Sequence, residues 1–236
     1  MKQELEHLYG LKLSATDSDI GKVKDFYFDD QTWQIRCLVA DTGGWLSGRQ
    51  VLLSPHAFDT DALDNAHGDA DHLRVNLTRQ QIEDSPSIET HRTVSRQYEE
   101  KYYSYHGWPH YWDGRIPGDA GFQAFTPEPF KEDRSHHGHN QRDDIHLRST
   151  QAITGYRVLA TDGDVGNVHG FVVDGKKRAI IEVIIELGQW RESTPLHVQT
   201  RHVALIDYET SSVFLDLPQG KLTHAAGIDL VQTTHQ

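Results

Sequence analysis

The sequence predicts a mainly β protein built from two small β-barrel modules that arose by internal duplication. A linker that is aromatic-rich and partly helical at first, and irregular after that, joins the modules. Three observations predict this fold: a repeat within the chain, short apolar runs separated by turn residues, and a stretch between the copies that resembles neither. A chain of 236 residues is long enough for one large domain or two small ones.

The internal repeat aligns residues 8–45 with residues 153–190 at a constant offset of 145 positions. Twelve of the 38 aligned pairs are identical, whereas average composition would give about two by chance. We therefore expect a first module at 1–90, a linker at 91–148, a second module at 149–222 and a C-terminal tail at 223–236. We also expect each module to have its own core, and a pseudo-twofold axis to relate the two. The identical pairs are Gly10/Gly155, Ala15/Ala160, Thr16/Thr161, Asp17/Asp162, Asp19/Asp164, Gly21/Gly166, Val23/Val168, Phe26/Phe171, Asp29/Asp174, Ile35/Ile180, Gly43/Gly188 and Trp45/Trp190.

Each module consists of short apolar runs that end at turn residues, a pattern typical of strands. In the second copy these runs are residues 157–160, 165–173, 179–187, 196–198, 203–206 and 213–215. Asp174-Gly175 is a hairpin signal between the second and the third run. Short strands at this spacing are typical of a small barrel or sandwich, and closure into a barrel would leave no exposed sheet edge.

Both copies carry the same turn, in which two aspartates precede a glycine. Aspartate side chains cap turns through neighbouring backbone groups, and glycine lets the chain bend into the following strand. We therefore assign these residues a structural role. The alternative is a Ca²⁺ or Mg²⁺ site, but the longer ligand series and the terminal glutamate of an EF-hand loop are missing. The residues are Asp17, Asp19 and Gly21 in the first copy and Asp162, Asp164 and Gly166 in the second.

The first part of the linker is dense in aromatic residues, which bury large areas and favour order. Tyr98, Tyr102 and Tyr105 recur at helical spacing, which predicts a short helix that ends at Gly107. We interpret the rings as a surface that docks on a module or on a second subunit. The alternative, stacking on nucleic acid or a planar ligand, would need a basic groove. The candidate interaction residues are Tyr98, Tyr102, Tyr105, Trp108, Tyr111 and Trp112.

Histidines gather in the second part of the linker, which is rich in glycine, proline and charged residues. His136, His137 and His139 are the candidate metal ligands, since imidazoles bind Zn²⁺, Ni²⁺ or Cu²⁺. A structural zinc site needs four fixed ligands, so adventitious binding or none is the alternative. Outside the linker, we interpret the Asp- and His-rich insertion at 56–72 as a solvated loop and Cys37 as a small buried hydrophobe.

Composition argues against several classes of protein. The formal net charge of −12 argues against a general affinity for nucleic acid or anionic membranes. No stretch approaches the roughly 20 apolar residues of a spanning helix, and the N-terminus lacks the apolar run of a signal peptide. A single cysteine leaves no internal disulfide. We therefore expect a cytoplasmic protein that is not inserted in a membrane.

The pattern shared by the two copies resembles the PRC-barrel family. It reads Thr-Asp-x-Asp-[Ile/Val]-Gly-x-Val, then Phe-x-[Phe/Val]-Asp, an Ile/Val-rich strand and Gly-x-Trp. That family is a small β-barrel found in the cytoplasmic part of the photosynthetic reaction centre H subunit and in the ribosome maturation factor RimM. Residues 51–56 and 75–79 are similar to a bacterial subgroup of stand-alone proteins with two such barrels. The resemblance implies a non-catalytic interaction module that often serves assembly, and it transfers no catalytic residues.

We expect a non-enzymatic protein-interaction or assembly module that forms a homodimer and needs no cofactor. An active site requires a nucleophile, an acid–base pair or a metal. The sequence has no Gly-x-Ser-x-Gly, no phosphate-binding glycine-rich loop and no His-Glu-x-x-His. Two alternatives stay open. One is a metal- or pH-responsive small-ligand binding protein that uses the His-rich linker; the other is an accessory protein related to photosynthetic reaction-centre electron transfer.

Overall fold

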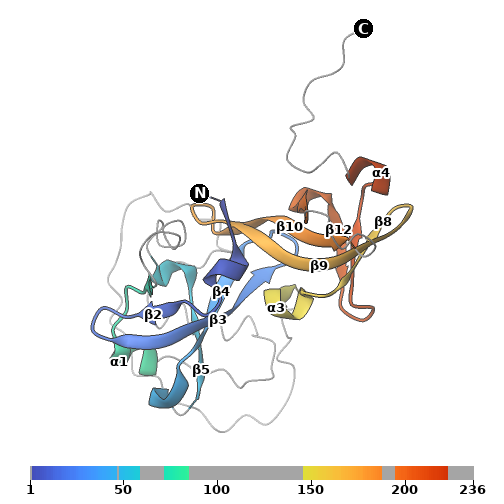
Figure 1. The fold of residues 1–236 in the computed structure, drawn as a ribbon. Coiled ribbons are helices and arrows are strands. Elements are labelled where there is room, and N and C mark those ends of the chain that lie inside the picture. Colours follow the sequence, from blue (N-terminus) through green and yellow to red (C-terminus); the bar gives the residue numbers. More distant parts are fainter. Residues whose placement is uncertain (1, 47, 59–71, 85–145, 188–194, 223–236) are drawn as a thin grey trace.

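The described part of the chain is mainly β, as the sequence predicts. The computed structural model describes residues 2–46, 48–58, 72–84, 146–187 and 195–222. Figure 1 shows their strands in two sheets, one formed mainly by the blue to green segments and the other mainly by the yellow to red segments. The elements before residue 85 are β1 (Lys2–Glu4), η1 (Leu5–Leu8), β2 (Lys12–Ser14), β3 (Asp19–Asp29), β4 (Ile35–Asp41), η2 (Gly43–Leu46), β5 (Gln50–Leu53), η3 (Pro55–Ala57), β6 (His72–Arg74) and α1 (Arg79–Glu83). The elements after residue 145 are β7 (Leu147–Ser149), α3 (Thr150–Ile153), β8 (Arg157–Ala160), β9 (Gly163–Asp174), β10 (Ala179–Leu187), β11 (Leu196–Gln199), η5 (Thr200–His202), β12 (Val203–Asp207), β13 (Ser212–Leu215) and α4 (Gln219–Leu222).

The first sheet has the strand order β5-β4-β3-β2-β6, and β7 also pairs with β3. Its long strand β3 largely alternates buried and less buried residues, because successive side chains of a strand point to opposite faces. Strand β4 is buried on both faces instead. Leu38 packs in the main core, whereas Cys37 packs in a second small cluster together with Leu52 and Leu147. Cys37 is therefore buried among apolar residues.

The second sheet has the order β11-β10-β9-β8-β13-β12, and β1 also pairs with β9. The strands predicted in the second copy are all present. The strand pairing is the same in the two sheets. In the second sheet, β8 pairs antiparallel with β9 and parallel with β13. In the first sheet, β2 pairs antiparallel with β3 and parallel with β6. The register corresponds as well, because Leu13 lies opposite Gly21 and Val158 lies opposite Gly166, each at the repeat offset.

We call the described residues up to 84 the first half and those from 146 to 222 the second half. One short strand of each half pairs with the sheet of the other half. Strand β1, at the N-terminus, pairs antiparallel with β9, and β7, which precedes the second half, pairs antiparallel with β3. The two pairings are equivalent, since Lys2 lies opposite Asp174 and Leu147 lies opposite Asp29. A first module drawn at 1–90 thus contains a strand that belongs to the second sheet.

The two halves also meet in a β-bridge between Gln34 and Ala179. The backbone amides of Ile35 and Ile180 donate to carbonyl groups of the opposite half, at 2.8 Å and 2.9 Å respectively. Gln34 and Ala179 are themselves one repeat offset apart, so this contact is equivalent to itself when the halves are interchanged. These pairings between the halves are the ones expected if a twofold axis that passes through this bridge relates the two halves.

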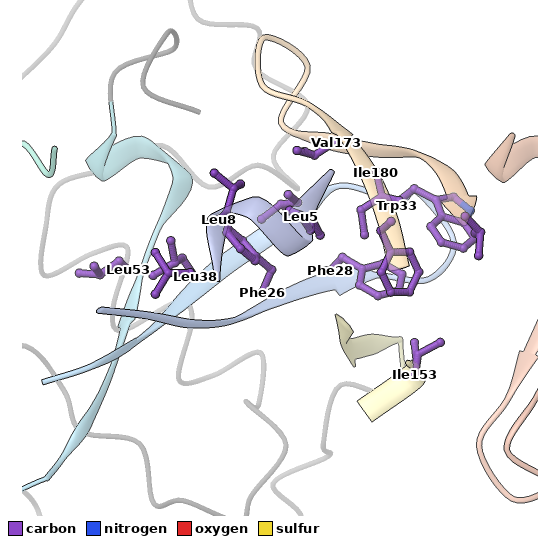
Figure 2. Packing of buried hydrophobic residues seen from close by; sticks show 14 of the residues in the cluster. Leu5, Leu8, Phe26, Phe28, Trp33, Leu38, Leu53, Ile153, Val173 and Ile180 are labelled. Carbon is purple, nitrogen blue, oxygen red and sulfur yellow. The ribbon is translucent and has the colours of Figure 1, made fainter. Parts of the chain in front are cut away.

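The structure differs from the predicted pair of closed barrels. Among the described residues, neither sheet closes on itself through hydrogen bonds. The expectation of separate cores is wrong, because one buried cluster runs through both halves. Figure 2 shows residues of β3 and η1 beside Val173 and Ile180 of the second half. The ring centroids of Phe28 and Phe171 lie 5.9 Å apart. The apolar face of each sheet is therefore buried partly against residues of the other half and partly against residues of its own half.

A buried carboxylate ties the halves together next to this core. Asp25 of β3 is 8% exposed and accepts hydrogen bonds from Ser149 Oγ at 2.5 Å, from Thr150 Oγ1 at 2.8 Å and from the amide of Gln151 at 3.1 Å. These donors form the start of α3, so a first-half side chain fixes the beginning of the second half. The Tyr9 hydroxyl lies 2.8 Å from Thr150 Oγ1, and burial raises the pKa of Tyr9 to about 12.

An ionic contact fastens β1 to the second sheet. Lys2 Nζ lies 2.7 Å from Glu182 Oε1, and His197 Nδ1 lies 3.1 Å from Glu182 Oε2. Burial alone would raise the pKa of Glu182, but the hydrogen bonds from Lys2 and His197 lower it below its ordinary value. The N-terminal strand is thus held by side chains as well as by its backbone ladder.

Candidate functional site

The repeated turn aspartates reach the short helix that follows the last paired strand of each half. Asp17 Oδ1 accepts a hydrogen bond from the amide of Arg79 at 2.9 Å, and Asp162 Oδ1 accepts one from the amide of Gln219 at 2.7 Å. Arg79 and Gln219 are the first residues of α1 and α4. These acids therefore connect the first hairpin of each half to its last helix, a connection that turn chemistry alone does not predict.

The second aspartate of each turn binds the neighbouring strand. Asp19 Oδ1 accepts from Ser14 Oγ at 2.8 Å, and Asp164 Oδ2 accepts from the Arg157 guanidinium at 2.6 Å. Gly21 has φ +134°, and a Cβ atom there would overlap the backbone carbonyl oxygen of Asp41. The two acids and the glycine thus have different neighbours, and their contacts hold strands and helices together.

The predicted interaction and metal residues lie outside the described residues. This holds for the aromatic set Tyr98, Tyr102, Tyr105, Trp108, Tyr111 and Trp112 and for His136, His137 and His139. Of the histidines in the insertion of the first half, His56 and His72 are described. His56 is half-buried, and burial lowers its pKa, with a further lowering by the guanidinium of Arg178 from the other half.

Some of the described histidines lie beside a carboxylate. His202 Nδ1 lies 3.0 Å from Asp216, and His146 Nδ1 lies 3.0 Å from Asp30. Within the ranges that the structure describes, no three side chains of His, Cys, Asp or Glu are grouped so that they could hold a metal ion. We therefore interpret these ion pairs as contacts that stabilise neighbouring strands and turns.

Strand β12, at the end of the second sheet, exposes apolar side chains. Leu205 is 57% exposed, and Ala204 beside it is exposed as well. The terminal strands of the first sheet are protected: β5 is almost entirely buried, and β6 presents His72 and Arg74 to solvent. Natural sheet edges are usually blunted by charge, proline or cover, because a bare apolar edge invites pairing with another chain. Within the described residues, β12 carries none of these protections over Val203 to Ile206.

An aromatic side chain extends the exposed apolar surface just after β12. Tyr208 is 47% exposed, and Leu205 and Tyr208 are the large hydrophobic residues that the described part of the chain exposes. The Tyr208 ring meets Tyr156 edge-on at 5.8 Å, and the guanidinium of Arg148 lies 5.2 Å from its centre. Burial of its inner side raises the pKa of Tyr208 above its ordinary value. Aromatic and arginine side chains are enriched where proteins bind one another.

This edge can bind an extended peptide segment through backbone hydrogen bonds and apolar contacts. We call it the β12 edge and define it as Val203–Asp207 with Tyr208. The sequence predicts the strand at 203–206 but not its exposure, because an apolar run of four residues is also typical of a buried strand. The position of this strand in the chain gave a hint of its exposure, because the second-last strand in the sequence can lie at the edge of an open sheet.

Comparison with known protein families finds a match for one segment of the chain. Residues 5–81 match the family model described as the PRC-barrel domain. Among curated proteins, none matches the chain. Over the residues that the structure describes, no helix has the length and apolar character to cross a membrane.

Proposed function

Residues 5–81 match the PRC-barrel domain, and from this premise we propose that the protein is a non-enzymatic interaction or assembly module that binds another protein chain at the β12 edge. The observation that carries the proposal is the exposure of Leu205 on a terminal strand and of Tyr208 just after that strand. Large apolar side chains at an open strand edge are unfavourable in water unless a partner covers them.

The contacts of the polar residues support a binding role over a catalytic one. The repeated acids are engaged in hydrogen bonds to helix starts and neighbouring strands. Asp25 is engaged by hydroxyl and amide donors that hold the two halves together. A catalytic centre would instead bring a nucleophile, a base and an orienting group to a common point. A homodimer through the β12 edge is one form of the proposed interaction.

The test compares Leu205→Asp with Gln199→Asp in the full chain. Both variants add one negative charge at an exposed strand position, but Gln199 lies on β11 at the opposite end of the same sheet. Tagged protein is used to capture partners from the native cell extract, and the mass of the purified protein is measured by sedimentation. We expect Leu205→Asp to lose the captured partner or the dimer, and Gln199→Asp to keep it. Equal capture and equal mass for wild type and both variants would refute the proposal.

A further inference from the structure

The β12 edge and the residues that flank it form a pattern that is complementary to itself. We infer that the partner at this edge is a second copy of the chain, and that the two β12 strands pair antiparallel across a twofold axis near Leu205. The order of apolar and charged side chains from Arg201 to Glu209 carries the inference. It rests on the proposed function, because it names the partner of the same edge.

Two successive apolar side chains are exposed at the centre of β12. Leu205 is the middle residue of this strand, which runs from Val203 to Asp207, and Ala204 beside it is exposed as well. In a regular strand one of two neighbouring side chains would face the core. The pairing of β12 with β13 instead shifts register between Val203 and Leu205, and such an irregularity breaks the alternation. The centre of the strand therefore presents an apolar contact surface.

Opposite charges lie at equal distances along the chain on either side of Leu205. Arg201 precedes it by four positions, and Glu209 follows it by four. Both side chains are exposed. Arg201 Nε donates to His202 Nε2 at 3.3 Å, and neither Arg201 nor Glu209 forms an ion pair within the described residues. In this part of the chain, both charges are therefore available to another molecule.

A twofold axis converts this order into charge complementarity. When two identical strands run antiparallel about one residue, each earlier residue lies opposite the residue that follows the axis by the same number of positions in the other copy. With the axis at Leu205, Arg201 of each copy faces Glu209 of the other, and the two Leu205 side chains meet. Opposite charges across paired strands are favourable, whereas two parallel copies in register would bring arginine to arginine. A partner of different sequence requires no such symmetry, so the pattern favours a second copy.

Two further features determine the extent of this contact. The amide of Val203 already donates to the carbonyl of Thr200, so the ladder between the copies is short and centred on Leu205. Tyr208 lies three positions after Leu205 and therefore comes opposite His202 of the other copy, which adds an aromatic contact at each end. A contact of this size is small for a permanent dimer, so we expect a monomer–dimer equilibrium that depends on protein concentration.

Charge reversal in the full chain tests the pairing. Sedimentation equilibrium over a range of concentrations gives the dimer dissociation constant of wild type, Arg201→Glu, Glu209→Arg and the double variant. Each contact occurs twice in a twofold interface, so we expect either single variant to raise this constant about tenfold or more, and the double variant to restore it. Lys221→Glu, which reverses an exposed charge on α4, is the matched control and should dissociate as wild type does. Single variants that dissociate like wild type, or a double variant as weak as either of them, would overturn the inference.

A single engineered cysteine locates the axis independently. In a Cys37→Ala background, Leu205→Cys is oxidised and compared with Gln199→Cys, an exposed position on β11 at the other end of the sheet. Residues opposite each other in an antiparallel pair have Cα atoms about 4.5–5.5 Å apart, which suits a disulfide. We expect Leu205→Cys to form covalent dimers in much higher yield than Gln199→Cys. Equal yields from the two variants contradict an axis near Leu205.

Sedimentation and capture together separate this inference from the proposed function. A dimer that Arg201→Glu weakens and the double variant restores supports both. A wild-type protein that stays monomeric at every concentration, but captures a different protein that Leu205→Asp loses, overturns the second copy as the partner and leaves the proposed function standing. A monomer that captures no protein refutes both.

Discussion

Aspartate and glycine have separate roles in the repeated turns. Asp17 and Asp162 accept backbone hydrogen bonds from residues 62 and 57 positions further along the chain. Asp19 and Asp164 bind side chains of the neighbouring strand. Gly21 lets β3 pass close to the end of β4. A pattern that looks like local turn chemistry in the sequence thus closes long-range contacts in each half.

Gly21→Ala should destabilise the protein, because its Cβ atom would overlap the carbonyl oxygen of Asp41 and its φ of +134° is unfavourable for other residues. We expect a loss of about 3 kcal/mol or more in the free energy of unfolding, measured by urea denaturation. Gly44→Ala is the control, since a Cβ atom there meets nothing within 4 Å. A loss at Gly21 no larger than that at Gly44 would contradict the close approach.

His56 should make stability depend on pH. Burial, and then the nearby Arg178 guanidinium, lower its pKa below the ordinary 6.5, so the folded state takes up a proton less readily than the unfolded chain. The contribution is complete above pH 6.5 and is lost as the pH falls below that value toward the lowered pKa. We expect the difference in unfolding free energy between wild type and His56→Gln to shrink from pH 7.5 to pH 5.

The control for this experiment is His72→Gln, which removes an exposed histidine from β6. Urea unfolding of the three proteins at each pH gives the free energies. The interpretation of His56 fails if the difference between wild type and His56→Gln is constant over this range, or if it grows as the pH falls.

At the scale of elements, the sequence predicts the strands better than their partners. Alternation and β-branched residues identify β9 and β10, and the repeat transfers them to β3 and β4. The exchange of β1 and β7 could not be predicted, because strands of three residues carry too little pattern to specify a partner. Leu205 was predicted to lie in a strand, but its exposure depends on which strand ends the sheet.

The bridge between Gln34 and Ala179 offers a direct test of how the halves pair. The flanking hydrogen bonds make this a non-hydrogen-bonded antiparallel pair, whose Cα atoms lie about 4.5 Å apart in regular sheets. Such a separation suits a disulfide. In a Cys37→Ala background, Gln34→Cys with Ala179→Cys should form a disulfide within one chain and stabilise the protein by about 2–4 kcal/mol.

Gln34→Cys combined with Lys177→Cys is the mismatched control, since Lys177 lies in the turn before β10 and does not face Gln34. Gel mobility without reductant distinguishes a disulfide within a chain from one between chains. A disulfide that forms equally well in the mismatched pair, or only between chains, would be incompatible with the bridge.

At the scale of the whole molecule, the halves form one interior. The main buried cluster includes residues from η1, β3 and β4 and from β9, β10 and β13. Strand exchange, the bridge at Gln34 and the buried Asp25 all cross between the halves. Neither half can unfold without exposing apolar surface of the other, so one cooperative transition is expected rather than two.

Gly166→Ala tests this cooperativity, because it disturbs the second half at the position equivalent to Gly21. Gly166 has φ +151°, so an added side chain strains β9. Hydrogen exchange of the slowest amides measures the stability of each half separately in the same sample. We expect the slowest amides of β3 and β4 to exchange faster by the same factor as those of β9 and β10, since all of them open only with the shared core. Faster exchange confined to β9 and β10 would show that the second half opens alone and that the interface contributes little to either sheet.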